Sequence, residues 1–261
     1  MVTLEEALAK AESESAAALK AAKGVGLSFK KVLDAAKHGN LKEIEKYLRA
    51  AEEGVEGLRQ KFAAARESWD IDAATYLSDG FFAKEVRQAA AKAGIKVYEL
   101  DDRLYCYPSL IRLLPDDRTV LIDKHKVTHL RPSVLVEHLK QQQGKPVRFK
   151  PESFLKSLKS AYDIAVSAGK KKRGGADTVA PLAEVYRILT LLPGQSKEYS
   201  KQEFARDLYL LDQEMASHGN NGPTLGLHTA RGGEPESKIF AIVSKNGELR
   251  RYYGISFAGG E

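Results

Sequence analysis

Residues 41–65, LKEIEKYLRAAEEGVEGLRQKFAAA, carry the most regular pattern in this chain of 261 residues. Apolar side chains recur there at alternating spacings of three and four, and most intervening positions are charged. The apolar positions are Leu41, Ile44, Leu48, Ala51, Val55, Leu58, Phe62 and Ala65. Such spacing places one apolar stripe along a helix, as in the a and d positions of a coiled coil. The sequence therefore predicts a long amphipathic helix here.

Another helix is expected upstream, over residues 3–22, with a weaker stripe that is half alanine and serine. Gly24 and Gly26 are expected to break it, since a glycine costs roughly 1 kcal/mol inside a helix. Two arrangements remain open. The two helices pack together as an antiparallel hairpin, for which the glycines supply a turn, or the second helix is a coiled-coil arm that docks a protein partner or a second copy. Gly54 and Gly57 are expected to mark a close contact or a bend.

The middle of the chain changes from helical to strand-like periodicity. Residues 70–93 predict a helix. The segments 95–100, 104–114 and 119–123 then predict a small antiparallel sheet of three strands. Two further helices follow, each with a proline near its first turn.

The C-terminal part has the element order of a winged helix-turn-helix. Helices are predicted over residues 181–193 and 201–214, with a short turn between them. Residues 217–237, rich in glycine, proline and asparagine, are expected to be a mobile loop. A β-hairpin with an Asn-Gly turn is predicted over residues 238–257.

These elements indicate an α+β fold that is mainly α. We expect a coiled-coil-like helical hairpin with a small antiparallel sheet, and a C-terminal winged-helix-like module that ends in a β-hairpin. The predicted parts are a helical region (1–68), an α+β middle domain (69–169), a basic linker (170–178) and the winged-helix-like module (179–261).

Positive charge is concentrated in residues 145–173. This segment holds nine Lys or Arg and two acids, a net charge of +7, whereas the whole chain carries +6. Phosphate contact and a solvated linker both explain such a segment. The side chains predicted to contact nucleic-acid phosphates are Lys156, Lys159, Lys170, Lys171, Lys172 and Arg173, with Lys245, Arg250 and Arg251 of the terminal hairpin.

Helix 201–214 would be the recognition helix of a winged helix-turn-helix. Its exposed face is expected to carry Lys201, Gln202 and Arg206 beside Glu203, Asp207 and Asp212. The acids disfavour entry into a DNA groove, because they repel the phosphates. An acidic helix of this kind fits a protein partner better.

Catalytic and metal sites are only weakly indicated. His125 and His129 have the spacing of a helical metal pair, but their segment has the composition of a strand or loop. Asp116 or Asp117 with Asp123 comes near the pattern of a metal-dependent nuclease, but the following lysine is one position too far along the strand. We therefore expect no enzyme activity, no metal site and no cofactor.

The single cysteine, Cys106, fits a reducing compartment and is expected to be a packed thiol. No apolar run reaches the roughly 18 residues that a membrane span needs, and the N-terminus lacks the pattern of a signal peptide. We expect a cytoplasmic protein without membrane contact.

The sequence favours a non-enzymatic accessory subunit of a prokaryotic assembly, for example in antiviral defence, that binds nucleic acid. Double-stranded DNA with weak sequence specificity is the expected ligand, because phosphate contacts carry no sequence information. The alternative is a protein-protein adaptor without nucleic-acid contact, and a metal-dependent nuclease is a lesser one.

Overall fold

The computed structural model describes residues 2–101, 103–145, 149–168, 178–218, 224–230 and 232–258. About 60% of the described residues are helical, which confirms a mainly α, α+β protein. The chain forms two compact units. The first comprises Met1–Ala93, Leu113–Val120 and Lys126–Glu137, and the second comprises Gly94–Arg112, Leu121–His125 and His138–Glu261. The domain boundaries expected from the sequence stay a prediction.

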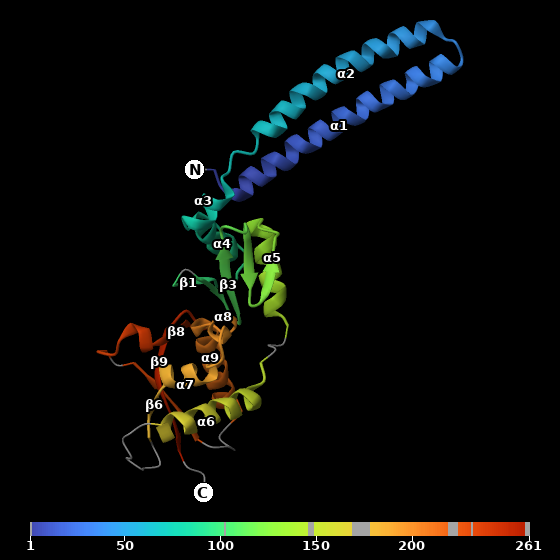
Figure 1. Ribbon diagram of the computed structural model, residues 1–261. Helices are drawn as coiled ribbons and strands as arrows, with labels where there is room; N and C mark the ends of the chain where they lie inside the picture. Colours follow the sequence, from blue (N-terminus) through green and yellow to red (C-terminus); the bar gives the residue numbers. More distant parts are fainter. Residues whose placement is uncertain are drawn as a thin grey trace. The chain divides into compact units, whose positions relative to one another are not determined.

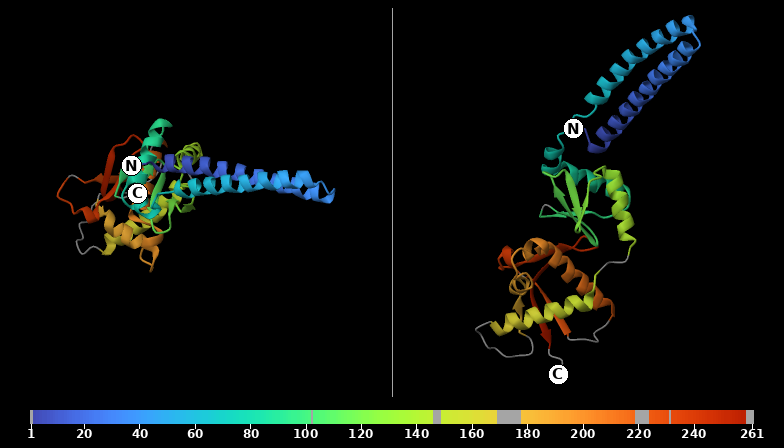
Figure 2. Two further views of the ribbon diagram at one scale, coloured as in Figure 1. Left: turned by 90° about the horizontal axis from the view of Figure 1, so that it is seen from above. Right: turned by 45° about the vertical axis from the view of Figure 1, so that its right-hand side comes forward.

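Two long helices, α1 (Leu4–Lys37) and α2 (Leu41–Glu67), form a helical hairpin in the first unit (Figure 1). They lie side by side along their length in every view (Figure 2). Helix α1 begins at a capping box, and Asn40 caps α2 through its side chain. Gly39 makes the turn between them with a φ of +68°, a conformation that glycine adopts without steric cost. The hairpin arrangement is thus confirmed.

The expected break at Gly24 and Gly26 is wrong, because α1 continues through both glycines to Lys37. Packing against α2 along this stretch offsets the low helix propensity of glycine. A Cβ on Gly54 of α2 would lie 3.0 Å from the Val25 side chain of α1. Gly54 therefore marks a close contact, as expected. Gly57 does not, since nothing lies within 4 Å of its Cβ position.

Buried polar contacts attach the start of α1 to the rest of the first unit, where α3 (Ala73–Ser78) and α4 (Phe81–Lys92) follow the hairpin. The Glu85 carboxylate accepts the backbone N–H groups of Leu4 (3.0 Å) and Glu5 (2.9 Å) and the hydroxyl of Tyr76 (2.6 Å). A carboxylate suits this position, because the N-terminus of a helix carries partial positive charge. Burial and the bond to Glu85 raise the pKa of Tyr76 to about 12.

The first sheet is a meander of five strands rather than the three expected. Its order is β1-β2-β3-β4-β5, formed by Tyr98–Leu100, Arg103–Cys106, Ser109–Leu114, Thr119–Ile122 and His125–Val127. Segment 104–114 is divided into β2 and β3, because Pro108 cannot donate to a strand ladder. Strand β5 was missed because it has only three residues and no apolar alternation. Helix α5 (Pro132–Gln143) follows the sheet.

The second unit contains helices α6, α7, α8 and α9 and a four-stranded sheet of order β6-β9-β7, with β8 also paired to β9. The helices are Pro151–Ala168, Leu182–Leu189, Gln195–Glu198 and Lys201–His218. The strands are Ala180–Pro181 (β6), Thr224–Thr229 (β7), Phe240–Val243 (β8) and Leu249–Ala258 (β9), with a 3-10 turn at Glu236–Lys238. Helices α7 and α9 and the hairpin β8–β9 form where two helices and a terminal hairpin were expected. The short helix α8 takes the place of the expected turn, and strand β7 precedes the hairpin.

The stretch 217–237 is not a loop throughout, because its residues Thr224–Thr229 form strand β7. Leu225 and Leu227 face Phe257 and Ile255 of β9 in the antiparallel register. The alternation of apolar residues in β7 thus outweighs the flanking glycines and prolines.

One apolar core holds the second unit together. The Phe204 ring of α9 lies 5.0 Å from Phe240 of β8 and 5.3 Å from Tyr186 of α7. Leu158 of α6 and Ile255 of β9 are fully buried in the same cluster. Helix α6 therefore packs with the helices and sheet that follow it in sequence.

Candidate interaction surfaces

The basic side chains expected to contact phosphates differ in their exposure and in their ion pairs with the protein. Lys156 of α6 is exposed and forms no ion pair with another described residue. Lys159 is half-buried, with its ammonium 2.6 Å from Asp163 and 5.5 Å from the centre of the Phe257 ring. The predicted residues Lys170, Lys171, Lys172 and Arg173 lie outside the described residues.

The three basic residues of the terminal hairpin already have protein partners. The ammonium of Lys245 lies 5.8 Å from the centre of the Tyr107 ring. Arg250 donates to Glu248 (2.8 Å), and Arg251 donates to Glu236. All three remain accessible at the surface, but the two arginines are partly neutralised.

Among the candidates that the structure describes, Lys159 and Arg251 do not belong to one compact patch. Lys159 lies over Phe257, whereas Arg251 precedes that phenylalanine by six residues on β9. At about 3.3 Å per residue of strand, the two sites are roughly 20 Å apart along β9. A nucleic acid would therefore meet separate cations.

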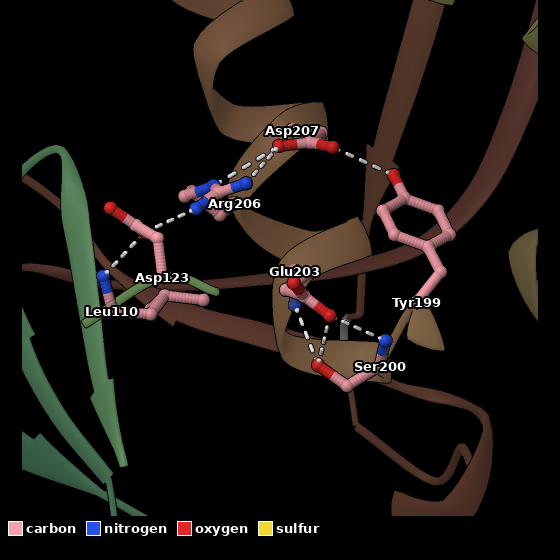
Figure 3. A network of polar contacts seen from close by, with 7 residues as sticks. All are labelled: Leu110, Asp123, Tyr199, Ser200, Glu203, Arg206 and Asp207. Carbon is pink, nitrogen blue, oxygen red and sulfur yellow. Dashed lines mark hydrogen bonds and ion pairs between the residues drawn. The ribbon is translucent and has the colours of Figure 1, made fainter. Parts of the chain in front are cut away.

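In α9, the expected recognition helix, the Arg206 side chain binds two carboxylates of the protein itself (Figure 3). Arg206 is only 19% exposed at its side chain and donates to Asp123 at 2.6 Å. Its other guanidinium nitrogens donate to Asp207, 3.0 and 3.1 Å away. Asp123 also accepts the backbone N–H of Leu110 at 3.1 Å, and Asp207 accepts the hydroxyl of Tyr199 at 2.8 Å. The expectation that Arg206 lies on an exposed face is wrong.

The electrostatics of this network keep Arg206 charged. Burial disfavours its charged form, but Asp207 and Asp123 outweigh that penalty and raise the pKa of the guanidinium. Glu203 is also buried and bonds the Ser200 hydroxyl and backbone N–H at the start of α9. The network fixes the first turns of α9 rather than offering cations to DNA.

The acids considered for a nuclease site are engaged elsewhere. Asp117 pairs with Lys126 at 2.7 Å, and Asp123 pairs with Arg206. Among the described residues, no group of three or more His, Cys, Asp or Glu could hold a metal ion.

Helices α1 and α2 expose several large apolar side chains. Ile44, Ala51 and Leu58 of α2 lie against α1 with Tyr47 and Gly54, at spacings of three and four. The other half of the predicted stripe stays in solvent. It consists of Leu41, Leu48, Val55 and Phe62, which are between 45% and 73% exposed. Their seven-residue spacing aligns them as one row, the α2 stripe.

Helix α1 adds apolar side chains to the same side of the hairpin. Ser28 of α1 and Tyr47 of α2 lie in the seam, the contact line between the two helices. Phe29 directly follows Ser28, and Leu48 directly follows Tyr47. In an antiparallel helix pair, equivalent flanking positions of the two helices lie on the same side of the seam. Phe29 and Leu33, one turn further on, are 47% and 64% exposed. We call the α2 stripe with Phe29 and Leu33 the apolar face of the hairpin.

An apolar groove of about 640 Å³ lies at the base of the hairpin in the first unit. Leu8 and Ser15 line it from α1, and they precede Phe29 by whole heptads. The groove therefore opens on the side of α1 that carries the apolar face. Trp69 lines its wall, and Arg131 beside it bridges Glu5 and Glu12 of α1. The sequence indicated this surface only as part of a helix seam.

No protein-family model matches the chain, and comparisons with curated proteins and with solved structures find no match either. Among the described helices, none is both long and apolar enough to cross a membrane.

Proposed function

We propose that this protein is an adaptor that binds a protein partner through the apolar face of its hairpin. The observation that carries the proposal is the α2 stripe, whose four large apolar residues are exposed in a row at heptad spacing. Monomeric soluble proteins seldom expose contiguous apolar patches beyond a few hundred Å², and larger ones mark interaction sites.

The base of the hairpin supports this role. Glu85 binds the first turn of α1, and Arg131 bridges Glu5 and Glu12 on the same helix. These contacts give the apolar face a defined attachment to its own unit. A partner then binds a presented surface without ordering a free helix, which lowers the entropic cost of association.

A photo-crosslinking experiment tests the proposal. A benzoylphenylalanine at position 55, within the α2 stripe, is compared with one at position 53, which is exposed on the opposite side of α2. Irradiation of cells that contain the protein is expected to give adducts from position 55 and few from position 53. Equal or absent adducts at the two positions would reject the apolar face as a protein-binding surface.

Nucleic-acid binding by a cytoplasmic accessory subunit is a second candidate, favoured by the exposed Lys156 in a segment of net charge +7. Replacing Lys156 and residues 170–173 by alanine is expected to reduce the salt dependence of duplex DNA binding. The log-log slope should fall by roughly 0.9 for each phosphate that the variant no longer neutralises. An unchanged slope would remove this candidate.

A further inference from the structure

On the side of α2 that bears the stripe, a second row of residues recurs at alternating spacings of four and three. It alternates apolar and charged residues: Leu41, Glu45, Leu48, Glu52, Val55, Arg59, Phe62 and Arg66. The two charged residues in the first half are acidic, and the two in the second half are basic. All four charged side chains are exposed, and none forms an ion pair with another described residue.

The order of these charges selects one orientation of a matching helix. A parallel copy of α2 would place glutamates against glutamates and arginines against arginines, which is destabilising. An antiparallel copy places Glu45 of each copy opposite Arg66 of the other. Glu52 of each copy likewise faces Arg59 of the other. This self-complementarity is what a two-fold symmetric interface requires, because one patch must fit itself.

Resting on the proposed function, we infer that the partner of the apolar face is a second copy of this chain. The two hairpins pack through their α2 stripes in antiparallel orientation and form a four-helix bundle. In the register set by the charges, Val55 lies near the two-fold axis and Leu48 packs beside Phe62 of the second copy. Leu41, the most exposed residue of the stripe, then points to the segment around Trp69 that lines the groove of the other copy.

The surface is large enough for such a dimer. From Leu41 to Phe62 the stripe extends over about 32 Å at 1.5 Å per helical residue. Two helices packed about 10 Å apart present a face roughly 20 Å wide. Each copy would thus cover about 600 Å², or about 1,200 Å² in total, within the range of specific interfaces.

Light scattering of the purified full-length chain tests the inference. The expected mass is about 57 kDa, twice the chain mass of 28.7 kDa. The double variant Leu48→Glu/Val55→Glu is expected to weaken association at least 100-fold or so and to give the mass of one chain. Glu53→Arg, on the opposite side of α2, is the matched control and should remain a dimer. Circular dichroism confirms that each variant stays helical.

Charge reversal tests the orientation. Each of the pairs Glu45→Arg/Glu52→Arg and Arg59→Glu/Arg66→Glu removes four interchain ion pairs. Each is expected to raise the dissociation constant roughly 50-fold, at two- to three-fold per exposed pair. The quadruple variant carries all four changes, restores every pair in the antiparallel dimer and should recover the wild-type constant. Failure of this recovery would overturn the antiparallel arrangement.

The outcomes separate this inference from the proposed function. A wild-type chain that has the mass of one copy at about 100 µM overturns self-association. If position 55 then still crosslinks to a different protein in cells, the adaptor function stands with another partner. If position 55 gives no adduct beyond that of position 53, the adaptor function fails as well.

Discussion

Replacing Glu85 by alanine is expected to destabilise the first unit strongly and to loosen the start of α1. The Glu85 carboxylate is buried and binds two backbone N–H groups of the first helical turn and the hydroxyl of Tyr76. Alanine removes these acceptors and leaves the backbone N–H groups of Leu4 and Glu5 facing a cavity. Only the bond from Leu4 to the Tyr76 oxygen, at 3.2 Å, would remain.

The size of the effect follows from the hydrogen bonds that the substitution removes. Hydrogen bonds to a charged group contribute roughly 1.5–3 kcal/mol each, and unsatisfied buried donors add a desolvation cost. The attraction of a carboxylate to a helix N-terminus adds roughly 0.3–1 kcal/mol. Because relaxation and water recover part of this, we expect a loss of about 3–4 kcal/mol for Glu85→Ala. Glu85→Gln keeps an acceptor oxygen and should lose about 1–2 kcal/mol.

Urea unfolding followed by circular dichroism measures the free energies, and hydrogen exchange localises the change. Exchange should accelerate most in residues 4–12, the first turns of α1. Glu53→Ala is the control, since this side chain is exposed on α2 and should change stability by less than about 0.5 kcal/mol. A Glu85→Ala variant as stable as this control, with unchanged exchange in residues 4–12, would refute the role of the carboxylate as the anchor of the hairpin.

Three further predictions concern single side chains. Arg206→Met leaves Asp123 and Asp207 without the guanidinium that they bind. The free energy of unfolding in urea should fall by about 3 kcal/mol. A loss below about 1 kcal/mol would contradict the network. Burial raises the pKa of Cys106 to about 11, so roughly one thiol in a thousand is ionised at pH 8. At this pH the folded protein should not react with a thiol reagent, while the urea-unfolded chain should react fully. Rapid labelling of the folded protein would contradict the burial of Cys106. Gly39→Ala forces a side chain into the left-handed region and should cost about 1 kcal/mol by thermal unfolding without changing the molecular mass, and an unchanged midpoint would contradict this turn geometry.

The sequence predicted the hairpin helix correctly but could not tell which of its apolar residues would be buried. Leu48 and Ala51 belong to the same predicted stripe, yet only Ala51 faces α1. The choice depends on the partner helix. Gly54 allows a close approach to Val25 of α1, but Ile44 and Leu58 face α1 as well. The size of a residue therefore does not decide whether it enters the seam.

The polar network was beyond prediction for a different reason. Arg206 and Asp123 are separated by 83 residues, and no local pattern reports a contact of that kind. Periodicity alone placed Arg206 on an exposed face of α9. The first sheet was partly predictable, because Pro108 signalled an interruption in segment 104–114 but did not show that strands would form on both sides of it.

Cysteine crosslinking at the expected two-fold axis tests the central claim most directly. The variant Val55→Cys is oxidised under native conditions and analysed without reductant, beside Glu53→Cys on the opposite side of α2. The native thiol of Cys106 is buried and should not contribute. Two hairpins that pack through their apolar faces predict a covalent dimer from Val55→Cys and almost none from Glu53→Cys. Equal yields from both variants, or none from Val55→Cys, would contradict the claim.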